Sequence, residues 1–182
     1  MSELRPPLGP QDHVQGNPNA PIRLVEYGDY ECPYCGRAYR IVKALQEALV
    51  DDLLFAWRNF PLSQVHPHAL RAAAAAEAAG LQDRFWEMHD MLFEHQDALD
   101  DAHLLAYGEL LGLDVERFAR DLDSDEVAER VRADFLSGAR SGVNGTPTFF
   151  VNGERYDGSW EPDAFLESLR DLLAEPASPE SP

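Results

Sequence analysis

Cys32 and Cys35 are the only cysteines in the chain, and their Cys-x-x-Cys spacing places them after an apolar run and at the head of a stretch with helical periodicity. Residues three apart on a helix lie about 5–6 Å apart between their Cβ atoms, whereas a disulfide needs roughly 3.5–4.5 Å. A small local adjustment would therefore join or release the two sulfurs. Because the loop so closed is very short, the bridge would stabilise the fold little. The motif favours a redox couple over a structural disulfide.

The position of the motif predicts a division of labour between the two thiols. Pro33 suits the first turn of a helix, where a missing backbone N–H is no loss. Cys32 then occupies the N-cap position and faces unpaired backbone N–H groups at the positive end of the helix dipole. This field lowers the pKa of Cys32 and favours its thiolate. We therefore predict that Cys32 is the attacking nucleophile, and that Cys35, one turn further in, resolves the mixed disulfide.

Composition narrows the class of protein. With 182 residues, of which 45% are hydrophobic and 26% charged, the chain is expected to form one globular domain, or one domain with a large insertion. Its net charge of −18 argues against nucleic-acid binding and against adsorption to anionic lipid. We expect no membrane insertion, since no apolar run approaches the length of a membrane-spanning helix. The start lacks a secretory pattern and the cysteines are few, so we expect a cytoplasmic location.

The first half of the chain predicts a strand–helix–strand unit. Residues 22–27 form a short apolar run between turn signals and are expected to be a buried strand. Apolar residues at helical spacing predict a helix over 33–50, and 53–58 reads as a second strand. Residues 13–14 could add a short edge strand. At this length the unit implies two parallel strands joined by a right-handed crossover.

In the second half of the chain, the spacing of apolar residues changes first to that of helices and then back to that of strands. Nearly all of 66–139 has helical periodicity, with a helix start predicted at Pro67. Strand character returns at 148–151, and the Asn-Gly pair that follows it predicts a hairpin into 154–157. An amphipathic helix is expected over 162–173.

Strand–helix–strand, helical block, hairpin and final helix, in this order, resemble the thioredoxin fold. The helical block between the two halves is similar to that of the DsbA-like branch of the superfamily. Three segments carry the resemblance, which covers roughly 14–173: residues 26–35 around the cysteines, 58–62 and 142–149. It implies an α/β fold with a mixed central sheet flanked by helices and an all-helical insertion.

On this basis the chain divides into five predicted parts. These are a flexible N-terminus at 1–12, the first half of a thioredoxin domain at 13–62, the helical insertion at 63–141, the second half of the domain at 142–174 and a disordered tail at 175–182. The tail is rich in proline and serine, a composition typical of disorder.

The resemblance also implies a substrate-binding segment at Thr146-Pro147. In the family, the proline at this position is cis and lies against the cysteine motif, and the backbone of the residue before it pairs with an extended substrate peptide, a form of strand addition. Without the resemblance, the alternative is an ordinary trans proline at the start of an edge strand. Thr146 and Pro147 are therefore predicted to bind substrate.

The dipeptide between the cysteines, Pro33-Tyr34, is expected to tune the redox couple and to contact substrate. Many DsbA-like oxidants have a histidine where this chain has Tyr34, and Pro-Tyr is common in glutaredoxins. Acidic residues near the motif, Asp29 and Glu31, should raise the pKa of Cys32, whereas Arg37 could lower it. The resemblance thus implies a weaker oxidant than the strongest members of the family.

Glu26 lies on the predicted buried strand, six residues before Cys32. A buried carboxylate is unfavourable unless it is paired or protonated. The resemblance implies that Glu26 relays a proton to and from Cys35 through water. The alternative is an ion pair with Arg23 or Arg58.

Taken together, these features predict a DsbA-like thiol–disulfide oxidoreductase. We expect it to need no cofactor, to act on protein or peptide thiols and disulfides, and to be reset by a redox recycling partner. One alternative is a glutaredoxin-like reductase that uses glutathione. Another is a non-catalytic module in which the cysteines, with His66 or His68, bind zinc or hold an iron–sulfur cluster.

Overall fold

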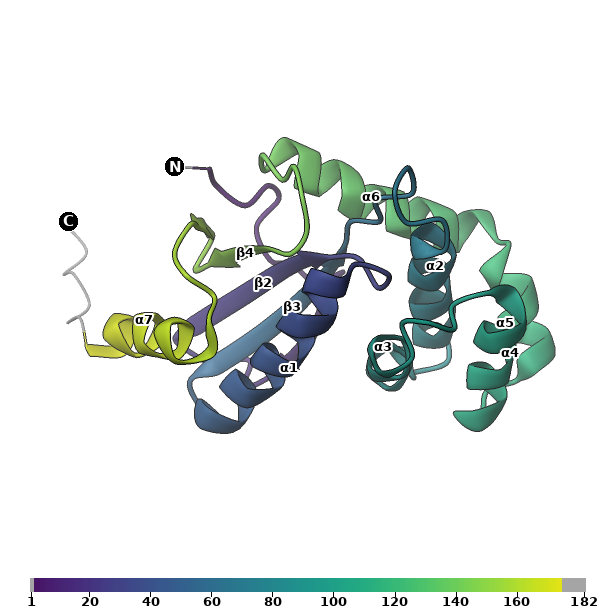
Figure 1. Ribbon diagram of the computed structural model, residues 1–182, viewed down its shortest axis with the longest axis horizontal. Coiled ribbons are helices and arrows are strands. Elements are labelled where there is room, and N and C mark those ends of the chain that lie inside the picture. Colours follow the sequence, from purple (N-terminus) through teal and green to yellow (C-terminus); the bar gives the residue numbers. More distant parts are fainter. Residues whose placement is uncertain (1, 175–182) are drawn as a thin grey trace.

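The computed structural model describes residues 2–174, and its centre is a five-stranded mixed sheet in the order β1-β3-β2-β4-β5 (Figure 1). The strands are β1 (His13–Gly16), β2 (Ile22–Gly28), β3 (Leu53–Asn59), β4 (Thr148–Val151) and β5 (Glu154–Tyr156). The β2 and β3 strands pair in parallel, and the other neighbouring pairs are antiparallel. The predicted thioredoxin-like fold is confirmed.

Seven helices are described along residues 2–174. They are α1 (Pro33–Ala48), α2 (Ala69–Gly80), α3 (Phe85–Glu94), α4 (Asp101–Leu110), α5 (Val115–Leu122), α6 (Asp125–Arg140) and α7 (Pro162–Ala174). The α2 helix begins two residues after Pro67, where a start was predicted, because His68 occupies its N-cap position. Within the described residues, no helix has the length and apolar character needed to cross a bilayer.

The central strand β2 supplies side chains to both faces of the sheet. Ile22 and Leu24 belong to the core that includes α1 and α7, whereas Val25 and Tyr27 belong to a smaller core on the other face. This alternation follows from the period of two in a strand. Glu26 shares its face with Ile22 and Leu24 and therefore points towards the helix that carries the cysteines.

The other face of the sheet is covered by α6, which runs across it in Figure 1. The hydroxyl groups of Tyr27 and Ser137 are 2.7 Å apart, and the rings of Phe60 and Phe135 stack with centroids 4.4 Å apart. A Cβ at Gly138 would come within 2.6 Å of the Phe60 ring, so a side chain there would push the helix away. The last helix of the predicted insertion thus also packs on the sheet.

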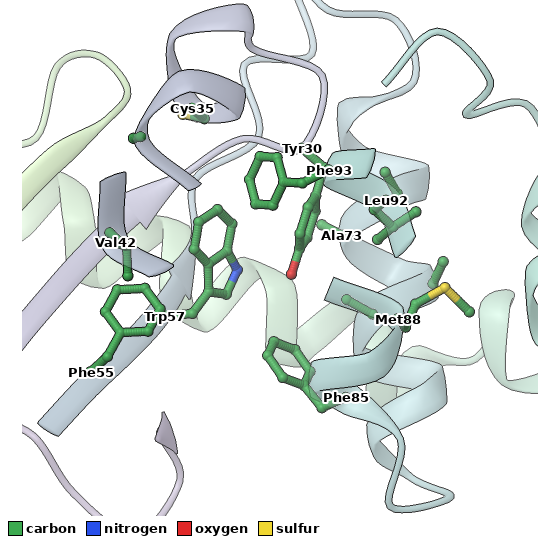
Figure 2. Close-up of a cluster of buried hydrophobic side chains, with 14 of the residues drawn as sticks. Tyr30, Cys35, Val42, Phe55, Trp57, Ala73, Phe85, Met88, Leu92 and Phe93 are labelled. Atoms are coloured by element: carbon green, nitrogen blue, oxygen red, sulfur yellow. The ribbon is translucent and has the colours of Figure 1, made fainter. Parts of the chain in front are cut away.

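An aromatic cluster joins the sheet to the helical block. Figure 2 shows Trp57 of β3 between Val42 of α1 and the rings of Tyr30 and Phe93. His89 is buried in the same cluster, and its Nδ1 lies 2.9 Å from the Tyr30 hydroxyl. Burial, followed by the nearby charges of Lys43 and His13, holds the pKa of His89 well below its usual value. The neutral imidazole and the protonated Tyr30 hydroxyl therefore share a hydrogen bond between uncharged groups.

The N-terminal segment differs from the loose end that was expected. Leu4 is buried, and its backbone N–H donates to the Gly153 carbonyl at 2.8 Å. The Arg58 guanidinium pairs with Asp12 and also donates to the Pro6 carbonyl. Buried charge and apolar packing fix residues 2–12 against the sheet, which their composition did not indicate. The predicted tail at 175–182 lies outside the described residues.

Candidate active site

Cys32 and Cys35 lie where β2 has ended and α1 begins. Cys32 is the N-cap residue, with φ −70° and ψ 122°, and Pro33 stands at the first helical position. Both thiols are free and buried, Cys32 with 3% and Cys35 with 0% of its surface exposed. Pro33 and Tyr34 are exposed beside them. The structure thus places the two sulfurs at the head of a helix, in the arrangement that the sequence predicts.

The surroundings of Cys32 favour its thiolate. The hydrogen bond with the Cys35 side chain is the largest effect and lowers the pKa of Cys32. Burial acts in the opposite direction, but hydrogen bonds from Thr146 and from the backbone of Cys35 and Tyr34 outweigh it, so that the pKa falls to about 5. At neutral pH, Cys32 is therefore mostly a thiolate.

Thr146 lies against Cys32 from a segment more than a hundred residues away. The Cys32 thiol donates to the Thr146 carbonyl with a separation of 3.6 Å, and the Thr146–Pro147 peptide bond is cis. The Thr146 hydroxyl is buried and has no hydrogen-bond partner among the described residues. Once Cys32 has lost its proton, this hydroxyl is the group of Thr146 that can donate to the sulfur.

Cys35 has the opposite electrostatic environment. Burial raises the pKa of Cys35 well above its usual value, and its hydrogen bond to Cys32 and the negative charges of Glu26 and Cys32 raise it further. The backbone N–H of Asp29 donates to the sulfur at 3.4 Å, which only partly opposes these effects. One thiol of the pair is thus a thiolate while the other keeps its proton.

Glu26 is buried beneath the cysteines with 2% of its surface exposed. Its Oε1 has no hydrogen-bond partner among the described residues, and burial followed by the charge of Cys32 raises the pKa of this carboxyl well above its usual value. The alternative ion pairs are not formed, because Arg58 pairs with Asp12 and Arg23 is exposed. Burial and the Cys32 charge therefore favour the protonated form of this carboxyl near the two sulfurs.

The segment before Cys32 is held through the side chain of Asp29. This carboxylate is fully buried and accepts hydrogen bonds from the backbone N–H of Glu31 at 2.8 Å and of Leu62 at 2.9 Å. It also pairs with Nδ1 of His66 at 2.8 Å. Asp29 therefore fixes the loop of the redox motif to the loop that precedes α2.

Two further contacts come from the helical block. Glu31 pairs with Nδ1 of His68 at 2.9 Å. The side-chain amide of Gln96 donates to the carbonyls of Tyr30 and Cys32 at 2.8 and 2.9 Å. Sequence reasoning missed Gln96 as part of the site and considered His66 only as a zinc ligand, because a side chain that reaches across 30 or more residues leaves no local pattern.

The charged groups that were expected to act on Cys32 have other partners. Asp29 and Glu31 are occupied by His66 and His68, and Arg37 pairs with Glu161. Both histidines that were considered as zinc ligands thus pair with carboxylates. Within residues 2–174, no group of three or more side chains of the metal-binding types is placed to hold an ion.

Comparison with known proteins agrees with this geometry. A family model described as thioredoxin matches residues 9–171, which include both cysteines, Glu26 and the Thr146–Pro147 segment. The chain belongs to the thioredoxin family. This assignment accounts for the mixed sheet with the cysteine pair at the head of α1.

Solved structures place the chain within this family. It is similar to a thioredoxin-like oxidoreductase from Silicibacter pomeroyi DSS-3, with a TM-score of 0.81, 30% identity and coverage of 93% of this chain and 95% of that one. It is also similar to oxidised BdbD from Bacillus subtilis, with a TM-score of 0.83, 25% identity and coverage of 96% and 98%. The fold is shared with α-DsbA1 of Wolbachia pipientis at 22% identity. The predicted resemblance to DsbA-like thiol–disulfide oxidoreductases is confirmed.

Curated relatives of higher identity are much longer proteins. The chain is 47% identical over 175 residues to Na(+)/H(+) antiporter NhaA 1 of Salinispora arenicola, and 44% identical over 171 residues to a protein of the same name from Mycobacterium sp. (strain KMS). These matches cover 94% and 93% of this chain but only 26% and 28% of the antiporters. The chain thus spans about a quarter of the length of these relatives.

Proposed function

We propose that the protein exchanges disulfides with protein or peptide thiols through the Cys32-Pro33-Tyr34-Cys35 couple, with Cys32 as the nucleophile and Cys35 as the resolving thiol. The observation that carries this proposal is the opposite shift of the two thiols, with a pKa of about 5 for Cys32 and a raised pKa for Cys35. A low pKa supplies the attacking or leaving thiolate, and a high pKa keeps the second thiol protonated until it is needed.

In the oxidising direction, a substrate thiolate attacks the Cys32 sulfur of the Cys32–Cys35 disulfide. A bond forms between the substrate and Cys32, and the bond between the two cysteines breaks, which leaves its electron pair on Cys35. Cys35 then takes a proton, which we assign to the Glu26 carboxyl acting through water. A second substrate thiolate attacks the substrate sulfur and releases Cys32 as a thiolate. The substrate loses two electrons, and the couple gains them; reduction is the reverse sequence.

The substrate peptide would lie along the Thr146–Pro147 segment. The Thr146 carbonyl already lies 3.6 Å from the Cys32 sulfur, which is the atom that forms the mixed disulfide. An extended peptide could pair with the backbone here, as in other cases of strand addition. Tyr34, with 64% of its surface exposed, and Pro33 would form the adjoining contact surface.

A trapping experiment tests this assignment. Cys35→Ser should accumulate a mixed disulfide on Cys32 when mixed with a reduced protein and an oxidant, because the resolving thiol is missing. Cys32→Ser should form no such adduct. The bound thiols can be identified by mass spectrometry. A predominant adduct on Cys35 in the second variant would contradict the roles proposed here, and a preference for glutathione over every protein thiol would favour the glutaredoxin-like alternative.

A second role is favoured by the curated relatives. Since a closely similar segment belongs to chains that are named antiporters, we propose that this domain works beside an NhaA-type membrane domain, within one chain or as a separate partner. The test is to trap Cys35→Ser adducts in membranes of the source cells and to analyse co-purified proteins. Antiporter peptides that are enriched over the Cys32→Ser control would support the role, and equal recovery with both variants would contradict it.

We also propose a cytoplasmic location for this domain, supported by its few cysteines. Labelling of Cys32 in intact cells distinguishes the two sides of the membrane. A thiol reagent that cannot cross the membrane should leave Cys32 unmodified until the cells are opened.

A further inference from the structure

The contact between Asp29 and His66 lies next to the redox-active cysteines, although His66 is far from them in the sequence. The backbone of Asp29 touches both cysteines, because its N–H donates to the Cys35 sulfur at 3.4 Å and its carbonyl accepts from the Cys32 N–H at 3.2 Å. The side chain of the same residue holds Nδ1 of His66 at 2.8 Å. Asp29 therefore connects His66 to both cysteines through direct contacts.

The buried carboxylate of Asp29 favours a positive charge on His66. The carboxylate of Asp29 is fully buried, and its other two partners are neutral backbone N–H groups. A buried charge is strongly disfavoured unless an opposite charge accompanies it. The side chain of His66, which is 21% exposed, forms the ion pair of the Asp29 carboxylate.

The negative charges around His66 act in the same direction. Burial alone would lower the pKa of His66, but the hydrogen bond and charge of Asp29 raise it, and the charges of Cys32 and Glu31 add to the rise. The neighbouring His68 faces Glu31 and is 47% exposed. His66 thus contacts one anionic group, Asp29, and is subject to the charges of two more, Glu31 and the reacting thiolate.

The redox motif itself supplies no cation for this task. Neither residue between the cysteines carries a positive charge, and Arg37, one turn further along α1, pairs with Glu161. We propose that His66, held by Asp29, is a positioning residue that stabilises the Cys32 thiolate and thereby makes the Cys32–Cys35 disulfide a stronger oxidant. This inference rests on the proposed function of the cysteine pair and adds a determinant of its potential.

The redox balance shows why the charge matters. Reduction of the disulfide takes two electrons from two substrate thiols, which become a substrate disulfide. It leaves Cys32 as a thiolate and Cys35 as a thiol, so the couple takes up one proton and the second is released to solvent. A cation that stabilises the thiolate stabilises the reduced form, and the disulfide then accepts electrons more readily.

The first test needs no substitution. If His66 stabilises the Cys32 thiolate, the thiolate must stabilise protonated His66 to the same degree. NMR titration of the His66 ring should therefore give a higher pKa in the reduced protein than in the oxidised one, whereas His68 should change less. Equal values for His66 in both redox states would overturn the inference.

The second test compares matched variants. His66→Gln should raise the thiolate pKa of Cys32 and lower the equilibrium constant for oxidation of glutathione by about tenfold, or about 30 mV in reduction potential. His66→Arg should retain much of the wild-type constant, and His68→Gln should stay close to it. Equal losses in the His66→Gln and His68→Gln proteins would overturn the inference.

These measurements also separate the inference from the proposed function. A wild-type protein with a reversible two-electron couple and an unchanged potential in His66→Gln would leave the function in place and remove the role of His66. A wild-type protein without such a couple would contradict the proposed function itself. If His66→Gln did not fold, the titration of the unaltered protein would decide.

Discussion

Cys32 and Cys35 share one helical turn, yet their pKa values move in opposite directions. The hydrogen bond between them is one cause of both shifts, because it stabilises the thiolate of Cys32 and the protonated form of Cys35. Burial is the largest cause at Cys35 and only opposes the shift at Cys32. The asymmetry therefore depends on depth along one turn of α1 as well as on the residue types.

The reactivity of Cys32 should depend on pH in a simple way. Since only the thiolate attacks, the alkylation rate should be constant between pH 7 and 8 and should fall with acidification through about pH 5. In Cys35→Ser, which keeps a hydroxyl donor, this midpoint should stay lower than in Cys35→Ala, which has none. Stopped-flow alkylation across pH 4 to 8 measures both. The same midpoint in the two variants would show that the side chain of residue 35 does not stabilise the thiolate.

Glu26 should make stability depend on pH. Its raised pKa means that the folded protein keeps a proton that the unfolded chain releases, so the free energy of unfolding falls as pH rises above about 4.3. Glu26→Gln removes this effect and should stabilise the protein by about 1 kcal/mol or more at pH 8, relative to its effect at pH 4. Urea unfolding at both pH values is the measurement.

The exposed glutamate Glu47 on α1 provides the control for this prediction. Glu47→Gln should change the free energy of unfolding equally at the two pH values. A similar pH response in both variants would indicate a general charge effect of the acidic chain rather than a property of Glu26.

The start of α1 depends on a close contact with the helical block. Gln96 follows α3 and donates to two carbonyls of the redox loop, and a Cβ at Gly36 would collide with its amide group. The absence of a side chain at position 36 therefore allows Gln96 to reach the backbone next to Cys32.

Substitutions at these two positions should not be additive. Gln96→Ala removes two hydrogen bonds and should lower the free energy of unfolding by about 1–3 kcal/mol. Gly36→Ala should have a similar effect, because its methyl group displaces the same amide. The double variant should lose little more than either single variant, and thermal unfolding of all four proteins measures the coupling. Strictly additive losses would show that the contact is not shared.

At the scale of the whole molecule, the N-terminal segment packs against the sheet and supplies a partner for a buried charge. Arg58 is nearly buried, with 3% of its side chain exposed, and Asp12 supplies the opposite charge from the N-terminal segment. The Arg58 guanidinium also donates to the carbonyls of Pro6 and Pro7. Residues 6–12 are thus part of the charge balance of the core.

Asp12→Ala should therefore be strongly destabilising. It leaves the Arg58 guanidinium buried without its carboxylate, which should lower the free energy of unfolding by about 3–5 kcal/mol. Glu3→Ala, in the same segment, breaks only an exposed pair with Arg5 and should change it by less than about 1 kcal/mol. Urea unfolding compares the two. Similar small losses would mean that Arg58 finds other partners or water.

Local sequence patterns predicted the elements that bury one regular face. The apolar run at 22–27 became β2, and the helical spacing after Cys32 became α1, which ends at Ala48, two residues before the predicted end. Hydrophobic periodicity and capping act within one element, so they can be read along the chain. The cysteine pair was found for the same reason, since its spacing is itself local.

The contacts that were missed join distant segments. His66 and Gln96 reach the redox loop from the helical block, and α6 packs on the sheet through Ser137 and Phe135 as well as on α2. The polar partners of Asp29 depend on the path of the chain in space, which the local spacing of apolar residues does not predict. The ion pair of Glu26 with Arg58, which was the alternative to the relay role, is not formed, because Asp12, a residue expected to be loose, pairs with Arg58 instead.

The helical block is more than an addition to an older fold. His66, His68 and Gln96 hold the loop before Cys32, and α6 covers one face of the sheet, so both the chemistry and the core draw on this segment. A chain trimmed to the bare strand–helix–strand and hairpin unit would keep its two sulfurs but would lose these supports and expose Tyr27 and Phe60. Grafting the block of one relative onto the sheet of another would therefore need matched partners for Asp29 and Glu31.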